Sequence, residues 1–161
     1  MQLAHVDRLA QYLAMKLSKQ VQLIIVADHG MTTLLPSLVH DFDSDTFLQN
    51  GIRALTGDVR ARHVCIESED IDKIQLTWSE RLDNNFIVLQ KQQAIEQGWF
   101  GPMVSNYAAD RIGDLVVVPT GRGGIICSRT ESGPSSWKGH HGSMTDDDQL
   151  MPMLITHGLS R

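Results

Sequence analysis

The sequence predicts an α/β fold in which a mostly parallel sheet carries helices on both faces. Apolar residues recur at three- and four-residue steps over residues 3–17, which indicates a helix with one buried face. The short, β-branched run over residues 21–27 is typical of a parallel strand that is covered on both sides. Helical and strand patterns continue to alternate without a repeat or a linker, so we expect one domain over residues 1–161.

The next elements follow in chain order. Residues 32–51 have a mixed pattern, and we expect only a loop with short elements there. Polar and apolar residues alternate over residues 61–67, which predicts a strand. The apolar spacing then predicts a helix from Ile71 to Leu82, with Ser68 as a suitable N-cap.

The second half of the chain gives weaker patterns. It is expected to hold a strand over 86–89, a helix over 91–97 that ends at Gly98, a strand over 112–119, a hairpin through 121–124 into 125–127, a loop over 128–149 and a short apolar segment over 150–155. Ligands of α/β sheets bind beyond the carboxyl ends of the strands, so residues just after a strand are the first candidates for function.

Composition narrows the class of protein. With 42% hydrophobic and 20% charged residues the chain is an ordinary globular protein, and its net charge of -5 argues against wrapping of nucleic acid. Cys65 and Cys127 have no closely spaced partner, which excludes a cysteine zinc ribbon and a disulfide framework and favours a reducing compartment. No apolar run is long enough to span a membrane, and residues 1–7 carry no secretory pattern. We therefore expect a cytoplasmic protein.

Two groups of residues could bind a metal ion. Asp28 and His29 directly follow the 21–27 strand, and an oxygen next to an imidazole nitrogen suits zinc or manganese. His140 and His141 lie between glycines in a polar loop. Each group also has a plainer interpretation, because Asp28 could form a turn and residues 146–148 could simply cap a helix.

Together these segments resemble one family. The Ile24-Ile25-Val26-Ala27-Asp28-His29-Gly30-Met31 strand end, the Arg111-Ile112-Gly113-Asp114 strand and the His141-Gly142-Ser143-Met144-Thr145 segment are similar, in order and spacing, to motifs of the alkaline phosphatase superfamily. The specific branch is the type I phosphodiesterase and nucleotide pyrophosphatase family. The resemblance runs over nearly the whole chain and implies an alkaline phosphatase-like fold.

The resemblance implies a site with two divalent metal ions, zinc first and manganese as the alternative. Asp28 and His29 would bind one ion and His141, which directly precedes the glycine, would bind the other. His140 would then lie in the second shell or face solvent. His5, His40, His63 and His157 are assigned no ligand role. Such a site cleaves phosphate esters or phosphoanhydrides of nucleotide-like small molecules through a covalent phospho-enzyme.

The same resemblance predicts that part of the family site lies outside this sequence. The family's nucleophilic Thr or Ser and further metal ligands precede the helix that begins near residue 3, so we expect the C-terminal portion of a domain, incomplete at its N-terminal side. Thr32 and Thr33 follow the Asp-His pair, where the family has no nucleophile, and are expected to begin a turn. The 161 residues alone should therefore be inactive, and an uncovered sheet edge should favour association.

Two other functions compete with the hydrolase. One is a metal-dependent phosphomutase of the same superfamily, although Met31 and the His-Gly-Ser-Met-Thr segment favour the phosphodiesterase branch. The other is a non-catalytic remnant that serves as a metal-binding or interaction domain. No substrate-binding residue can be named, because the pocket walls that select the substrate lie largely outside these motifs.

Overall fold

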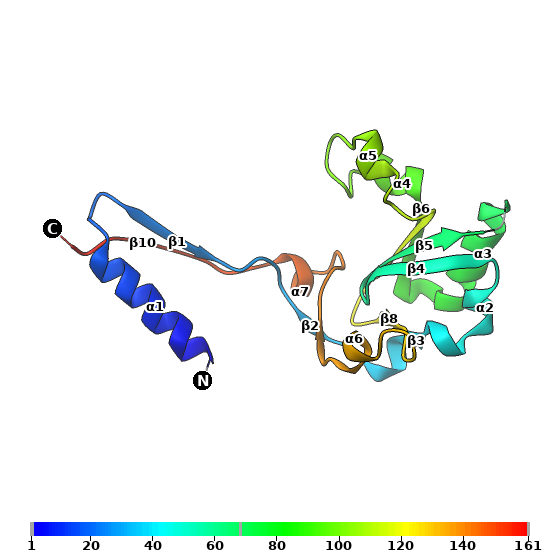
Figure 1. Ribbon diagram of the computed structural model, residues 1–161, viewed down its shortest axis with the longest axis horizontal. Coiled ribbons are helices and arrows are strands. Elements are labelled where there is room, and N and C mark those ends of the chain that lie inside the picture. Colours follow the sequence, from blue (N-terminus) through cyan, green and yellow to red (C-terminus); the bar gives the residue numbers. More distant parts are fainter. Residues whose placement is uncertain (1, 68, 161) are drawn as a thin grey trace. The chain divides into compact units, whose positions relative to one another are not determined.

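A computed structural model describes residues 2–67 and 69–160, and the chain folds as two compact units (Figure 1). We call residues 1–30 and 150–161 the terminal unit, and residues 31–149 the central unit. Helices and sheets occur together, which confirms the α/β class. Each unit is described by itself.

The terminal unit consists of one helix and a two-stranded ladder. Helix α1 (Gln2–Lys16) precedes β1 (Gln22–Val26), which pairs with β10 (Met153–His157). The expected helix and strand are thus present, but the parallel direction expected for the strand is wrong for this ladder, which is antiparallel. Both strands are largely exposed because the unit contains no layer that covers them, and Ala14 is its single buried hydrophobic residue among those described.

The central unit is built on a four-stranded antiparallel sheet with the strand order β4-β5-β7-β6. Its strands are β4 (Ile52–Asp58), β5 (Ala61–Ile66), β6 (Phe86–Gln90) and β7 (Leu115–Pro119). The sequence predicted the last three and missed β4. The expectation of mostly parallel strands is wrong here as well, because β4 and β5 are joined by a tight turn, which brings strands together antiparallel.

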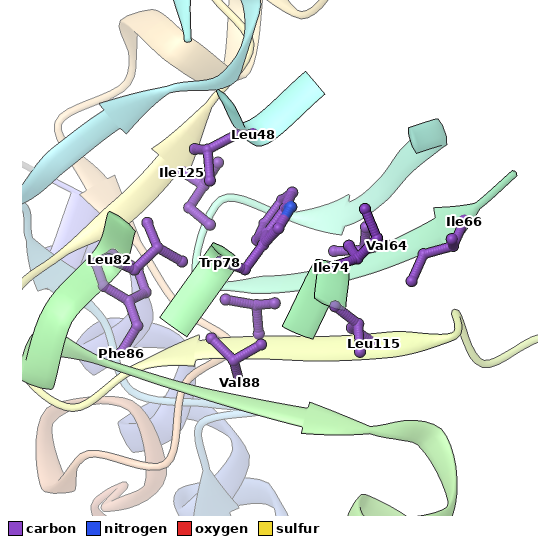
Figure 2. Close-up of a cluster of buried hydrophobic side chains, with 11 residues drawn as sticks. Leu48, Val64, Ile66, Ile74, Trp78, Leu82, Phe86, Val88, Leu115 and Ile125 are labelled. Atoms are coloured by element: carbon purple, nitrogen blue, oxygen red, sulfur yellow. The ribbon is translucent and has the colours of Figure 1, made fainter. Parts of the chain in front are cut away.

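Helices cover both faces of this sheet, as predicted. Trp78 of α3 (Ile71–Leu82) is fully buried against Val64, Val88 and Val117, within the core that Figure 2 shows. On the opposite face, Ala94 of α4 (Lys91–Glu96) packs with Val116. Alternate residues of β7 therefore serve different cores, as the two-residue period of a strand requires.

The predicted hairpin after β7 is wrong. Strand β8 (Gly124–Ile126) pairs in parallel with β3 (Val39–Asp41) instead. Both edges of β7 are already paired, with β5 on one side and β6 on the other, so β7 has no free edge for a hairpin partner. Asp70 caps α3 by accepting a hydrogen bond from the Lys73 N–H, while the expected cap, Ser68, lies outside the described residues.

Short elements fill the regions where the sequence showed little periodicity. They are β2 (Thr32–Thr33), η1 (Pro36–Leu38), η2 (Phe42–Ser44), α2 (Thr46–Gln49), η3 (Asp83–Asn85), α5 (Asn106–Ala109), α6 (Ser132–Ser136), β9 (Gly139–His140) and α7 (Asp146–Gln149). Residues 31–51 and 120–149, in which most of them lie, are therefore held by side-chain contacts more than by long ladders.

Candidate metal centre

Asp28 and His29 form a local pair of metal-binding atoms just after β1. The Nδ1 atom of His29 lies 2.7 Å from the carbonyl oxygen of Gly30, and a carbonyl only accepts, so Nδ1 carries the proton. In the neutral ring Nε2 therefore holds the lone pair, and it lies 3.5 Å from Oδ2 of Asp28. A histidine ligand commonly donates its other ring N–H to a carbonyl in this way, so the donor set fits a divalent cation.

His140 is held inside the central unit. Its side chain is buried, and its Nε2 lies 3.0 Å from the carbonyl oxygen of Trp137, to which it donates. The prediction that His140 faces solvent is wrong, because this hydrogen bond and the β9 ladder place it in the interior.

His141 occupies a tight loop between β9 and α7. It is half-buried, and the next residue, Gly142, has a φ of 116°, a conformation that favours glycine. A Cβ at position 142 would also lie 3.2 Å from Cβ of Ala61. The glycine after His141 is thus required by the backbone path and by the close approach of β5.

A short ladder pairs the residues after Asp-His-Gly-Met with the residues just before His141. Thr32, three residues after His29, pairs with His140, and Thr33 pairs with Gly139. The structure thus corrects the expectation that Thr32 and Thr33 begin a turn, because they form a strand. A Cβ on Gly139 would lie 2.6 Å from Sδ of Met31, so the methionine of Asp-His-Gly-Met lies against the glycine before the histidine pair.

A buried ion pair fixes the loop that follows His141. Arg60 and Asp148 are both inaccessible to solvent; Nε of Arg60 lies 2.9 Å from Oδ1 of Asp148, and one terminal nitrogen lies 2.5 Å from Oδ2. Arg60 also donates to the carbonyls of Gly121 and Gly123, and the hydroxyl of Thr145 donates to Asp148. Burial alone would raise the pKa of Asp148, but the hydrogen bonds from Arg60 and Thr145 outweigh it and lower that pKa.

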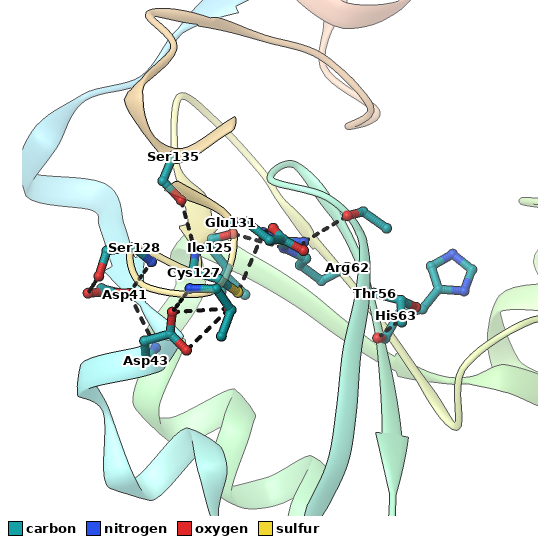
Figure 3. A network of polar contacts seen from close by, with 12 residues as sticks. Asp41, Asp43, Thr56, Arg62, His63, Ile125, Cys127, Ser128, Glu131 and Ser135 are labelled. Atoms are coloured by element: carbon teal, nitrogen blue, oxygen red, sulfur yellow. Dashed lines mark hydrogen bonds and ion pairs between the residues drawn. The ribbon is translucent and has the colours of Figure 1, made fainter. Parts of the chain in front are cut away.

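A second buried arginine organises the neighbouring loop (Figure 3). Arg62 of β5 donates to the carbonyls of Ile125 and Gly57, at 2.9 and 2.7 Å, and forms an ion pair with Glu131 at 2.7 Å. Nearby, the carboxylate of Asp43 accepts the backbone N–H groups of Arg129 and Thr130. These contacts connect residues that are far apart in sequence, so they give the loop a defined path.

The Arg-Ile-Gly-Asp segment has a structural role in the central unit. The carboxylate of Asp114 accepts the N–H of Ile66 at 2.8 Å, and the N–H of Gly113 donates to Nδ1 of His63 at 3.1 Å. A Cβ on Gly113 would lie 2.8 Å from the backbone nitrogen of Val64, so only glycine allows this approach.

The four predicted site residues lie in the sequence as two adjacent pairs, one in each unit. Asp28 and His29 are adjacent in the terminal unit, and His140 and His141 are adjacent in the central unit. Over residues 2–67 and 69–160 no three His, Cys, Asp or Glu side chains come close enough to hold a metal ion. Within those same ranges, no helix has both the length and the apolar character needed to cross a membrane.

Sequence reasoning missed Arg60, Arg62 and Asp148. Their charges made them look like surface residues, and the ion-pair partner of each arginine lies far away in the chain. One signal was present: Arg60 and Arg62 alternate with apolar residues where the strand over residues 61–67 begins, and a charge that such a strand buries requires a partner.

Comparison with known families gives one match. The family model of type I phosphodiesterases/nucleotide pyrophosphatases matches residues 1–144. No curated protein matches the sequence.

Solved structures match almost the whole chain. Human ectonucleotide pyrophosphatase/phosphodiesterase 5 is 18% identical with a TM-score of 0.63, and the match covers 99% of this chain and 40% of that one. Phosphonoacetate hydrolase from Sinorhizobium meliloti 1021, solved with phosphonoformate, is 18% identical with a TM-score of 0.58, and the match covers 95% of this chain and 38% of that one. These likenesses show an alkaline phosphatase-like fold, of which this chain spans about two fifths.

Proposed function

Because the chain belongs to the type I phosphodiesterase/nucleotide pyrophosphatase family, we propose that it carries part of the two-metal site of a phosphoric ester hydrolase. One observation carries this proposal: after β1, the lone pair of His29 Nε2 and the carboxylate of Asp28 lie together, with Nδ1 fixed on a backbone carbonyl. Zinc is the expected ion, and manganese is the alternative.

The ligand assignments are those that the family motifs imply. Asp28 and His29 bind one ion, and His141 binds the other. His140 is the poorer choice between the adjacent histidines, since its Nε2 already donates to the Trp137 carbonyl.

The bound ions would polarise the phosphoryl oxygens and lower the pKa of an attacking hydroxyl. The residues of this chain orient that site. The Gly30 carbonyl keeps the proton of His29 on Nδ1, so that Nε2 would be the ring atom that binds an ion, and the Arg60–Asp148 pair fixes the backbone after His141. The hydroxyl nucleophile and the remaining ligands come from a polypeptide segment outside these 161 residues. The substrate is a phosphate ester or a nucleotide-like small molecule.

Metal binding tests the ligand assignments directly. We expect calorimetric titration with zinc to detect binding by the chain, and His29→Ala to weaken it at least tenfold. His141→Ala should remove a separate, weaker site. His157→Ala is the matched control, because His157 also precedes a glycine but lies on an exposed strand. Equal zinc affinity in all four proteins would contradict the assignments.

Turnover tests the function. The chain alone should hydrolyse bis(4-nitrophenyl) phosphate little or not at all with zinc or manganese, whereas a polypeptide that also contains the region encoded upstream should be active. In that longer polypeptide, Asp28→Ala or His141→Ala should lower kcat/KM by orders of magnitude while the protein stays folded. Full activity of either variant would overturn the site, and inactivity of the longer wild-type polypeptide would favour a non-catalytic binding domain.

A further inference from the structure

A pocket of about 610 Å³ lies where α2, the turn after it, the residue after β5 and α3 meet in the central unit. This volume falls in the usual range for sites that bind small molecules. Its lining includes Phe47, Gln49, Asn50, Glu67 and Thr77. The described residues that line it include none of the metal ligands proposed above, so what this pocket binds is a separate question.

Phe47 is an aromatic residue that the structure holds at the surface. Its side chain is 67% exposed, whereas the next residue, Leu48, is fully buried in the core that Figure 2 shows. The carboxylate of Asp45 accepts the N–H groups of Phe47 and Leu48, at 3.0 and 3.4 Å, and so caps α2. Because the cap and the buried leucine fix this short helix, the Phe47 ring is presented to solvent in a defined position.

Phe47 lines this pocket and also a smaller one of about 240 Å³. The guanidinium of Arg81 lies 5.7 Å from the centroid of the Phe47 ring, and an ion pair of 2.6 Å with Asp45 holds it there. Of the two pockets, Arg81 lines the smaller one. Its contact with the ring therefore leaves ring surface available in the larger pocket.

Polar side chains surround this exposed ring. A backbone hydrogen bond of 2.9 Å from the Glu67 N–H to the Gly51 carbonyl joins the turn after α2 to the end of β5, and it brings the exposed side chains of Asn50 and Glu67 to neighbouring stretches of backbone. The side-chain nitrogen of Gln49 donates to the Phe42 carbonyl at 2.6 Å, which fixes that amide. The pocket thus offers amides and a carboxylate within a frame that the backbone sets.

The charge and polarity of the lining limit the class of ligand. Among the described lining residues Glu67 carries the one charge, and no lysine or arginine is present, so phosphate and other anions are disfavoured. Amides, hydroxyls and a carboxylate suit a ligand with many hydroxyl groups, because each hydroxyl both donates and accepts. An exposed aromatic ring suits the C–H face of a sugar ring whose hydroxyls point outward from its edge.

We propose that this pocket binds a neutral sugar, a pyranose ring with equatorial hydroxyls. One C–H face of the sugar lies on Phe47, and the hydroxyls at its edge meet the Asn50 amide and the Glu67 carboxylate. The sugar site is independent of the proposed metal centre, because it rests on residues 42–67 and 69–81 of the central unit alone.

Nuclear magnetic resonance of the 161-residue chain tests this with methyl β-D-glucopyranoside, in which every ring hydroxyl is equatorial. We expect millimolar glucoside to shift the ring signals of Phe47 and the side-chain amide signals of Asn50. The ring signals of Tyr107 and Trp137, which are also exposed, should stay unchanged. Sorbitol has similar hydroxyls but no ring face, so it should bind about tenfold more weakly. Absence of a shift with the glucoside, or equal binding of sorbitol, would overturn the proposal.

Variants identify the groups that hold the sugar. Phe47→Ala should weaken glucoside binding about tenfold, and Phe47→Tyr should retain it. Tyr107→Ala removes a similarly exposed aromatic ring and should leave the affinity unchanged. Glu67→Gln should weaken binding by a smaller factor, because the amide oxygen still accepts a hydrogen bond. Thermal unfolding confirms that each variant is folded, and wild-type affinity of folded Phe47→Ala would contradict the site.

Two results would assign the pocket to another class of ligand. Shifts of Phe47 and Asn50 with putrescine, and none with the glucoside, would indicate an organic cation on Glu67. Shifts of the same residues with protein concentration, and none with the glucoside, would indicate that a second copy of the chain covers the pocket. Either result would overturn the sugar site.

Discussion

The terminal and central units differ in how they use apolar residues. In the terminal unit, Ile24, Val26 and Ile155 lie on a two-stranded ladder and are each at least half exposed. In the central unit, Val116, Val117 and Val118 of β7 and Ile125 of β8 are almost fully buried. The hydrophobic pattern is similar, so the difference lies in whether a second layer is present to bury it. The central unit contains its own core, and the terminal unit presents surfaces that suit a neighbouring layer.

The largest expected effect concerns the buried ion pair of the central unit. Asp148→Ala leaves the Arg60 charge buried and without its partner, so we expect a loss of about 3–5 kcal/mol in the free energy of unfolding. Arg81→Ala removes the half-exposed partner of Asp45 and should cost about 1 kcal/mol or less. Urea unfolding followed by tryptophan fluorescence measures both, because all three tryptophans lie in the central unit. Equal losses of unfolding free energy in the two variants would contradict the claim that the Arg60 charge is buried and needs Asp148 as its partner.

A matched pair of valines compares the two units directly. Val117 is 1% exposed and Val26 is 60% exposed, although both lie in strands. Val117→Ala removes buried methyl groups and leaves a cavity, so it should cost about 2–3 kcal/mol. Val26→Ala should change stability by about 0.5 kcal/mol or less. Urea unfolding followed by far-ultraviolet circular dichroism, to which both units contribute, compares them, and a larger loss for Val26 would show that the terminal ladder contributes a core of its own.

Association should depend on the terminal unit. Ile24→Lys places a charge on the exposed ladder, so sedimentation velocity should show fewer oligomers than in the wild-type chain. The unfolding midpoint of the central unit should move by an amount equivalent to about 0.5 kcal/mol or less. Met103→Lys, on an exposed residue of the central unit, is the control. If Met103→Lys reduces the oligomers and Ile24→Lys does not, the associating surface lies in the central unit and the prediction is wrong.

The smallest expected effect is a change in acid sensitivity. The backbone N–H groups of Thr130 and Arg129 lower the pKa of Asp43 in the folded chain. The folded state therefore binds fewer protons than the unfolded state, and its stability falls as the pH drops through the ordinary carboxyl range. Asp43→Asn should be slightly less stable at pH 7 and should lose less stability between pH 6 and about 3. An unchanged slope would show that these hydrogen bonds do not form in solution.

Local patterns were predicted well, and distant pairings were not. The helix at Ile71–Leu82 was placed correctly because its apolar spacing lies within one short stretch. Strand β4 was missed, and β8 was assigned to the wrong partner, because pairing depends on which edges other segments leave free. The strand directions were wrong for the same reason: an apolar run indicates burial but does not specify the direction of its neighbour.

The candidate site shows the same difference between local patterns and distant contacts. The sequence placed Asp28 and His29 at the end of a strand, and the Gly30 carbonyl that orients His29 is only one residue away. It could not show that His140 would be buried, since this depends on Trp137 and on the ladder with Thr32. The ligand roles of Asp28, His29 and His141 stay predictions that zinc titration can decide.

The ladder of β1 and β10 has a consequence for how such a protein can evolve. Val26 is paired with Met153, so residues 27–152 form one long connection between two paired strands. The entropic cost of closing such a connection grows only with the logarithm of its length, by about 0.6 kcal/mol of free energy for each doubling. Insertions or deletions between these two strands therefore cost the ladder little free energy.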